Sequence, residues 1–137
     1  MIVSLHVATG GLVGALAGSR ARAALLGLAV HALGDAVPHQ DIASRRFETA
    51  SGAAGLLLLA AVRGPLHPVV VGAVGATVPD VEHVLRLPRP GGRKLFPSHR
   101  VHGWHRSGGL PASLQVAAAG VILGVLASRG LYGRVGR

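Results

Sequence analysis

Histidine and carboxylate side chains that could hold a metal ion gather in three short stretches of this sequence. The first is His31-Ala-Leu-Gly-Asp35, whose two polar residues are four positions apart and share one face of a helix. Imidazole nitrogen and carboxylate oxygen are both zinc ligands, and both suit manganese or iron. The alternative is a hydrogen bond between His31 and Asp35. His39 and Asp41 follow within six residues.

The second stretch is Pro79-Asp80-Val-Glu82-His83. Asp80 and His83 are three residues apart and lie on one face if the helix continues, which makes them candidate ligands. Glu82 points elsewhere, which suits a general base outside the metal coordination. The alternative is a polar helix end with no ligand role.

The third stretch is the densest, with His99, His102 and His105 within seven residues and Arg100 and Arg106 among them. The arginines favour an anionic substrate, because guanidinium binds phosphate oxygens in a fork. Helical spacing leaves open whether His99 or His102 partners His105. The alternative is a basic segment that contacts anionic lipid.

The composition narrows the chemistry further. The chain has no cysteine, so a metal would be held by His, Asp or Glu rather than by thiolates. Ser98 and Ser107 lie near histidines, but no Ser-His-Asp arrangement is evident, which disfavours a serine hydrolase.

Runs without charged residues predict the helices that must position these side chains. The runs cover residues 1–19, 23–34, 49–62, 64–79 and 107–128. A membrane-spanning helix needs about 20 residues, and the first and last runs meet that length. Half of the 137 residues are apolar, only 14% are charged, and the mean hydropathy is +0.49. We therefore expect an all-α integral-membrane bundle of about five helices, with four to five spans.

The expected bundle is a single domain over residues 1–137, with a basic Pro/Gly-rich loop at about 86–100. Gly10, Gly14 and Gly18 repeat at Gly-x-x-x-Gly spacing, which predicts close helix packing. Alternating spans would bring all five acids and seven of the eight histidines to one membrane face. Eight Lys/Arg on that face against six on the other favour a cytoplasmic orientation, in a multi-pass cell-membrane protein.

The net charge of +9 predicts an anionic partner. Membrane lipid and a phosphate-bearing substrate both fit. Nucleic acid is disfavoured, because the basic residues sit in short loops between apolar runs rather than on one continuous surface.

At these motifs the sequence resembles the bacterial membrane-bound metal-dependent hydrolase family, whose pattern has an early histidine, a Leu-Pro-Asp-x-Asp-His run, a His-Arg-Gly-x-Thr-His-Ser run and a His-x-x-x-Asp pair. His6 matches the early histidine, and Asp80 to His83 match the second run with Glu82 at the middle acid. The pair His31 and Asp35 is also similar to an element of zinc-dependent phospholipase C and P1-type nucleases.

The resemblance implies a membrane-embedded hydrolase that acts on a phosphoester or a lipid-linked substrate. It would hold one or two divalent ions, with zinc favoured. The implied ligands are His6, His31, Asp35, Asp80, His83, His99 and His105. Glu82 or Asp41 would be the general base, and Arg100 and Arg106 would bind the substrate. The alternative function is a non-enzymatic membrane protein that binds a metal or anionic lipid.

Overall fold

The fold is all-helical in a computed structural model that describes residues 1–85 and 87–135, with side chains to Ser128. The main helices are α1 (Val3–Leu16), α2 (Arg20–Ala36), α3 (Arg45–Arg63), α4 (Pro68–Thr77) and α7 (Ala112–Val135). Two one-turn α-helices, α5 (Val81–Val84) and α6 (Pro97–Arg100), and two 3₁₀ turns, η1 (Val78–Asp80) and η2 (Pro90–Gly92), complete the described elements. No strand forms in this part of the chain, which agrees with the expected helical class.

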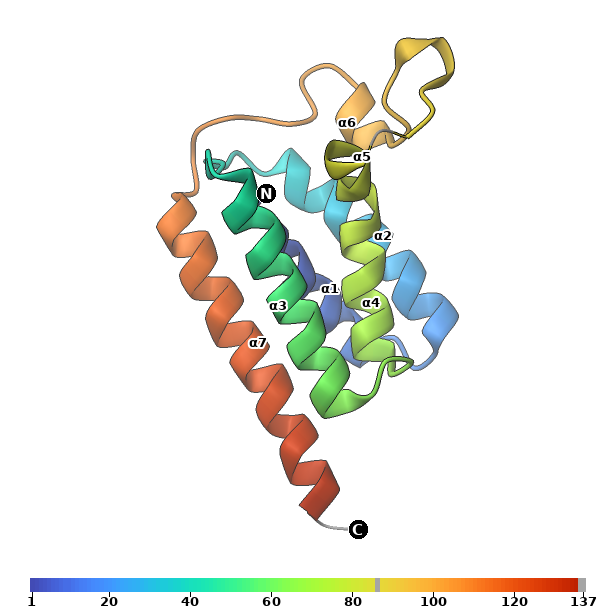
Figure 1. Ribbon diagram of the computed structural model, residues 1–137, viewed down its shortest axis with the longest axis vertical. Coiled ribbons are helices and arrows are strands. Elements are labelled where there is room, and N and C mark those ends of the chain that lie inside the picture. The colour runs from blue at the N-terminus through green and yellow to red at the C-terminus, as the bar shows by residue number, and fades with distance from the viewer. Residues whose placement is uncertain (86, 136–137) are drawn as a thin grey trace.

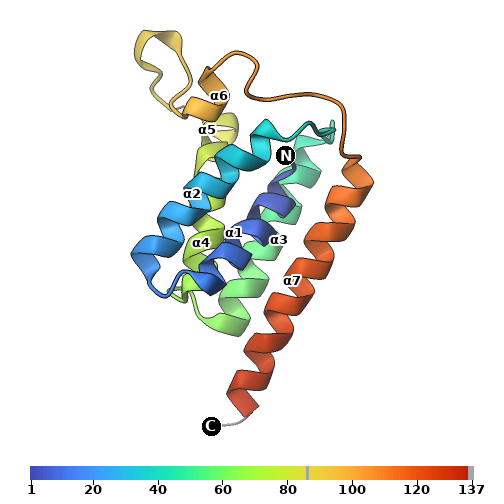
Figure 2. The ribbon, with the colours of Figure 1, turned by 180° about the vertical axis from the view of Figure 1, so that it is seen from behind.

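Helix α1 occupies the centre of the bundle. It contacts α2, α3, α4 and α7; Figure 1 shows it behind α3 and α4, and Figure 2 shows it between α2 and α7 from the other side. The N-terminus lies at the same end of the bundle as α5, α6 and the connecting loops, whereas α7 runs to the opposite end. This topology brings together the three stretches that carry the candidate ligands.

The five main helices correspond to the five predicted runs, with their ends moved by local caps. The turn at Gly18, with a φ of +69°, follows the end of α1. The Ser19 hydroxyl caps α2 by accepting from the Arg22 N–H at 3.3 Å. Ser44 caps α3 in the same way, accepting from Phe47 N–H, so α3 begins earlier than its charge-free run.

The expectation of membrane-spanning helices is wrong. In residues 1–85 and 87–135, no described helix is both long enough and apolar enough to cross a bilayer. Helices α1 and α4 are apolar but have only 14 and 10 residues, against the roughly 20 that a span requires. Helix α3 carries Arg45, Arg46 and Glu48 in its first turn and Arg63 in its last. The multi-pass localisation and the cytoplasmic assignment of the site fall with the spans.

Close packing of α1, α2 and α4 depends on glycine. A Cβ on Gly14 would lie 2.3 Å from the Pro68 carbonyl oxygen, and one on Gly27 would lie 2.3 Å from that of Gly72. Gly10 has equally little room against Ala76. The predicted Gly-x-x-x-Gly face is thus a helix contact at Gly10 and Gly14. It holds the α4 backbone close to the residues of α2 that carry candidate ligands.

Candidate metal centre

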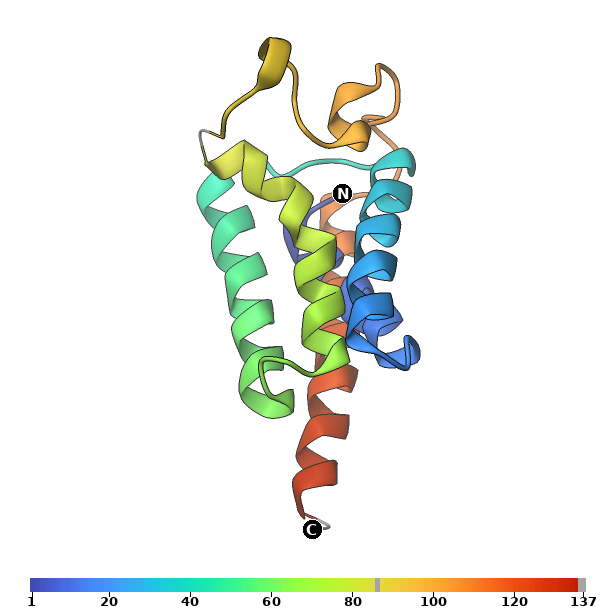
Figure 3. The same cartoon turned by 90° about the vertical axis from the view of Figure 1, so that its right-hand side faces the viewer.

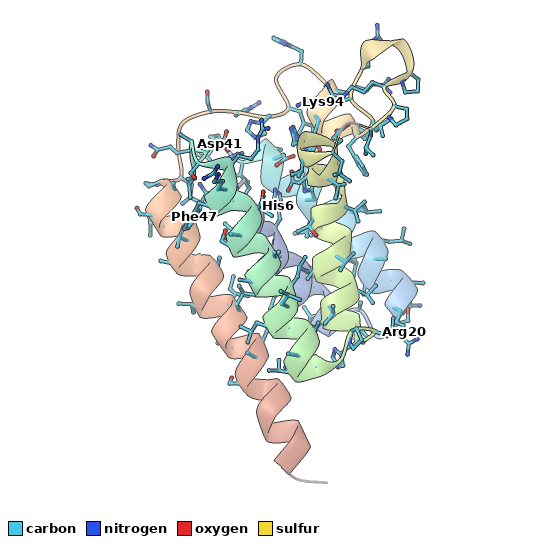
Figure 4. All side chains as sticks on the ribbon, viewed as in Figure 1. His6, Arg20, Asp41, Phe47 and Lys94 are labelled. Carbon is cyan, nitrogen blue, oxygen red and sulfur yellow. The ribbon has the colours of Figure 1, made fainter. Side chains whose placement is uncertain are left out.

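The polar end of the bundle holds nearly all of the histidines and acids. Figure 3 shows α5, α6 and the loops around them covering the ends of α2 and α4. In Figure 4, Asp41 and Lys94 lie at this end and Arg20 lies at the other. His67 lies apart, where its Nδ1 accepts from Val69 N–H at the start of α4.

The described residues contain four groups of His and Asp side chains that could hold a metal ion. Within each group the ligand atoms lie within 4.8 Å of one another. The groups are His31-Asp35-His99, His6-His31-Asp80, Asp80-His83-His99 and His39-Asp41-His105. The first is named the inner group and the last the rim group. A metal-binding capacity is therefore present, as the sequence predicted, although the identity of the ion is not given by the groups themselves.

The inner group brings two imidazoles onto one carboxylate. His31 Nε2 lies 3.1 Å and His99 Nε2 lies 3.4 Å from Asp35 Oδ2. The two Nε2 atoms are 3.3 Å apart. His31 and Asp35 are 1% and 2% exposed, so water does not screen this contact. The predicted pairing across one helical turn of α2 is realised, and α6 supplies the third side chain.

The tautomers of His31 and His99 are set by their other ring nitrogens. His31 Nδ1–H donates to the carbonyl of Ala76 at 2.8 Å, and His99 Nδ1–H donates to Glu82 at 2.6 Å. A neutral imidazole carries a proton on only one nitrogen. Both Nε2 atoms therefore present lone pairs to each other and to the carboxylate.

A cation among these three atoms, either a proton on an imidazole or a metal ion, relieves the repulsion between their lone pairs, and hydrogen bonds from His31, His6 and His99 to Asp35 correspond to the proton. Beyond these imidazoles, the buried Asp35 Oδ2 has no hydrogen-bond partner among the described residues. Burial favours the neutral acid, but the imidazoles of His31, His6 and His99 outweigh it and hold the pKa of Asp35 well below its usual range. The carboxylate is thus ionised and available to a metal ion.

His6 and Asp80 adjoin the inner group and form a further group with His31. His6 Nε2–H donates to Asp35 Oδ1 at 3.2 Å, and its ring stacks on that of His31. Burial lowers the pKa of His6 to about 4, so the ring is neutral near pH 7. Asp80 Oδ1 is 3.8 Å from His99 Nε2, while its buried Oδ2 has no hydrogen-bond partner in the described chain.

Glu82 lies in a different setting from the one expected of a general base. Its side chain is 1% exposed and accepts from His99 Nδ1–H and from the backbone N–H groups of Leu95 and Phe96. Although burial opposes it, these donors lower the pKa of Glu82. A fully engaged carboxylate does not take up a proton readily, so the geometry supports orientation of His99 instead.

The remaining candidates divide between the pocket and its surroundings. An open cavity of about 610 Å³ is lined by Asp35, Asp80 and His99 from the inner region and by Asp41 and His105 from the rim. His83 also lines this cavity, and burial, with the charges of His99 and Lys94, lowers its pKa to about 4.

The two predicted substrate-binding arginines, Arg100 and Arg106, do not line this cavity. Arg45 and Lys94 do. They lie outside the His/Asp motifs, so spacing gave no reason to select them. One further polar residue also escaped prediction. Gln115, fully buried, accepts from Ile2 N–H and donates to the carbonyls of Gln40 and Leu110; a lone glutamine in an apolar run was the available signal.

Comparison with known proteins identifies no relative of this chain. No family model, curated protein or solved structure matches the chain. The resemblance to membrane-bound metal-dependent hydrolases therefore stays a prediction, and the argument for function depends on the geometry of the polar end.

Proposed function

We propose that this protein is a metal-dependent hydrolase whose inner group holds a divalent ion and acts on a phosphoester. The observation that carries the proposal is the convergence of His31 Nε2, His99 Nε2 and Asp35 Oδ2, with distances of 3.1 to 3.4 Å and with both Nδ1 atoms already engaged. Histidine ligands in metalloenzymes are oriented in this way by a carbonyl or carboxylate on the other ring nitrogen.

Zinc is the ion that this donor set favours. Two neutral imidazoles and one carboxylate are a common zinc ligand set in hydrolases, and manganese or iron would accept the same donors. Catalytic zinc sites usually have three protein ligands and keep one position open, whereas structural sites are closed by four. Asp35 and His99 line the open cavity, so the fourth position is accessible to water and substrate.

The cavity also supports an anionic substrate. Arg45 and Lys94 line it together with Asp35, and each supplies a positive charge that can pair with phosphate oxygens. These two residues take the role that the sequence assigned to Arg100 and Arg106. The overall charge of +9 agrees with an anionic ligand.

The chemistry is the addition of water to phosphorus. A bound divalent ion would supply charge neutralisation and polarise the attacking water. The water oxygen forms a bond to phosphorus, the ester P–O bond breaks, and the proton of the water passes to a carboxylate. Asp80 fits that role, because it lines the cavity and its Oδ2 has no hydrogen-bond partner among the described residues. The leaving alkoxide takes a proton from solvent.

The test uses purified protein and bis(p-nitrophenyl) phosphate as the probe. We expect hydrolysis that is abolished by a chelator, restored by zinc or manganese, and absent from Asp35→Asn. Lys94→Ala should raise KM about tenfold through the loss of one charge-assisted contact. Arg100→Ala is the matched control and should leave KM unchanged. Metal binding without turnover of this probe would contradict the proposal and identify a non-catalytic metal-binding protein.

A further inference from the structure

The rim group lies outside the inner site, and of its three residues only His105 was a predicted metal ligand. His39 Nε2 is 3.1 Å from His105 Nε2 and 3.2 Å from Asp41 Oδ1, and His105 Nε2 is 4.0 Å from that same oxygen. The sequence gave His39 no role and treated Asp41 as a candidate base. The three side chains nevertheless form a second compact set of zinc-type donors.

His39 has the same tautomer signature as the inner histidines. It is 1% exposed, and its Nδ1–H donates to the carbonyl of Val37 at 2.6 Å. Its Nε2 therefore carries a lone pair that faces the Nε2 of His105. The N-terminal ammonium of Met1 contacts this Nε2, and the adjacent carboxylate of Asp41 also favours a cation there.

Backbone pairing between two loops holds the rim group together. His39 N–H donates to the Arg106 carbonyl at 3.1 Å, Gln40 N–H to Leu110 at 3.0 Å, and Leu110 N–H to Pro38 at 2.9 Å. His105 precedes the paired segment directly, so its position relative to His39 is defined by main-chain hydrogen bonds. The arrangement is a built site and not a chance meeting of surface side chains.

The rim group is adjacent to the inner group. The N-terminal ammonium of Met1 donates to Asp35 Oδ1 at 3.1 Å and to His39 Nε2, so one positively charged group bridges a ligand residue of each set. Asp41 and His105 line the same cavity as Asp35 and His99. A ligand in this cavity can reach both groups at once.

We infer that the rim group is a second divalent-cation site, with His39, Asp41 and His105 as ligands, and that the cavity takes two ions. Asp41 is then a ligand and not the general base. The binding of this ion stands on the rim geometry alone, whereas its use in catalysis rests on the proposed function. Two ions held by the inner and rim groups would supply more charge neutralisation to a phosphoester than one ion alone.

The experiment measures metal stoichiometry on the full chain, stripped with chelator and titrated with zinc by calorimetry, with bound metal counted by mass spectrometry. Wild type should bind two equivalents, and His105→Ala and Asp41→Ala should each bind one. The side chains of His105 and Asp41 are 40% and 60% exposed, so these variants should fold normally, which circular dichroism checks. His102→Ala, an exposed histidine of the same loop, is the matched control and should keep two equivalents.

One equivalent in wild type, or two in both His105→Ala and Asp41→Ala, would overturn the rim site. If wild type binds one equivalent but still hydrolyses bis(p-nitrophenyl) phosphate in a metal-dependent way, the proposed function stands and the rim inference fails. If wild type binds two equivalents, loses one in His105→Ala and hydrolyses nothing, the rim site stands and the proposed function fails.

Discussion

The inner and rim groups use the same donor types but are supported in different ways. The inner ligands His31 and Asp35 come from one face of α2, and His99 is held by a buried carboxylate. The rim ligands come from two loops joined by main-chain hydrogen bonds, and two of their three side chains are largely exposed. Because the donor types are the same but the inner ligands are more buried and more firmly held, we expect the inner ion to bind tightly and the rim ion to exchange readily.

The largest expected effect is the loss of the inner ion in Asp35→Asn. The variant keeps the shape of the side chain but removes the charge that faces His31 and His99. Structural zinc sites contribute on the order of 10 to 16 kcal/mol over four ligands, so one ligand corresponds to about 3 kcal/mol, or roughly 100-fold or more in Kd. Competition titration with a chromophoric chelator measures it. A variant that retains wild-type zinc affinity would remove the distinction between the groups.

Asp80→Asn tests how much the buried Asp80 carboxylate lowers the free energy of unfolding when no metal ion is bound. Burial raises the pKa of Asp80 from 3.8 to about 6, so the folded protein binds this proton more tightly than the unfolded chain. The resulting stabilisation is complete below pH 3.8 and is lost as the pH rises through about 6. In chelator, Asp80→Asn should exceed wild type in free energy of unfolding by at most about 3 kcal/mol near pH 7.

The measurement for Asp80→Asn is urea denaturation at both ends of that pH window, and the difference between the two proteins should nearly vanish at the acidic end. An equal difference at both pH values would mean that the substitution acts through packing and not through the buried charge. Asp41→Asn is the control, because its exposed carboxylate gains little from neutralisation.

Glu82→Gln separates orientation from ligation. The single amide oxygen can replace either Oε2, which accepts from Leu95, or Oε1, which accepts from Phe96 and His99, and the charge that fixes the tautomer of His99 is lost. Partners of this kind typically change metal affinity about 10- to 100-fold. We expect that loss for the inner ion in calorimetry and none for the rim ion. Glu48→Gln is the matched control, since among the described residues Glu48 accepts from Val3 N–H and from no histidine. An equal loss of metal affinity at the inner and rim groups would show that the two groups are not held in place independently.

The smallest effect is expected from Gly27→Ala. The new Cβ would lie 2.3 Å from the Gly72 carbonyl oxygen, which pushes α2 away from α4 and strains the bond from His31 to Ala76. Overpacking of this kind destabilises by about 1 to 3 kcal/mol. Thermal unfolding should show the loss, and zinc affinity of the inner group should fall several-fold while the rim group keeps its own. Gly120→Ala, with nothing within 4 Å of its Cβ, should be neutral or stabilising.

The places and the order of the five main helices and the His31–Asp35 pair were predictable because each depends on local sequence pattern, whereas the one-turn helices α5 and α6 were not predicted. Charge-free runs gave five segments in the right places, and i,i+4 spacing placed two ligands on one face. The error about the membrane arose from treating an apolar run as a helix of equal length. Gly18 and Pro68 cut the runs at α1 and α4, so local backbone geometry overrode the hydropathy pattern.

The rim site and the cavity lining could not be predicted from spacing. His39 and His105 lie close together because two loops pair through their backbones. Backbone hydrogen bonds do not depend on side-chain identity, so the sequence does not indicate them. Arg45 enters the cavity from the first turn of α3, on a different helix from His31 and Asp35. Glu82 resembled a base because the donors that neutralise its reactivity come from positions thirteen to seventeen residues away.

The hydrogen bonds of Glu82 to both the backbone and His99 affect where the length of this chain can change. Because its carboxylate binds the N–H groups of Leu95 and Phe96 as well as His99, the segment leading into α6 is anchored at the site itself. The turn around η2 is then not needed to position the ligands. We therefore expect insertions and deletions between Arg89 and Arg93 to be tolerated. The same turn is a suitable position for inserting a reporter tag.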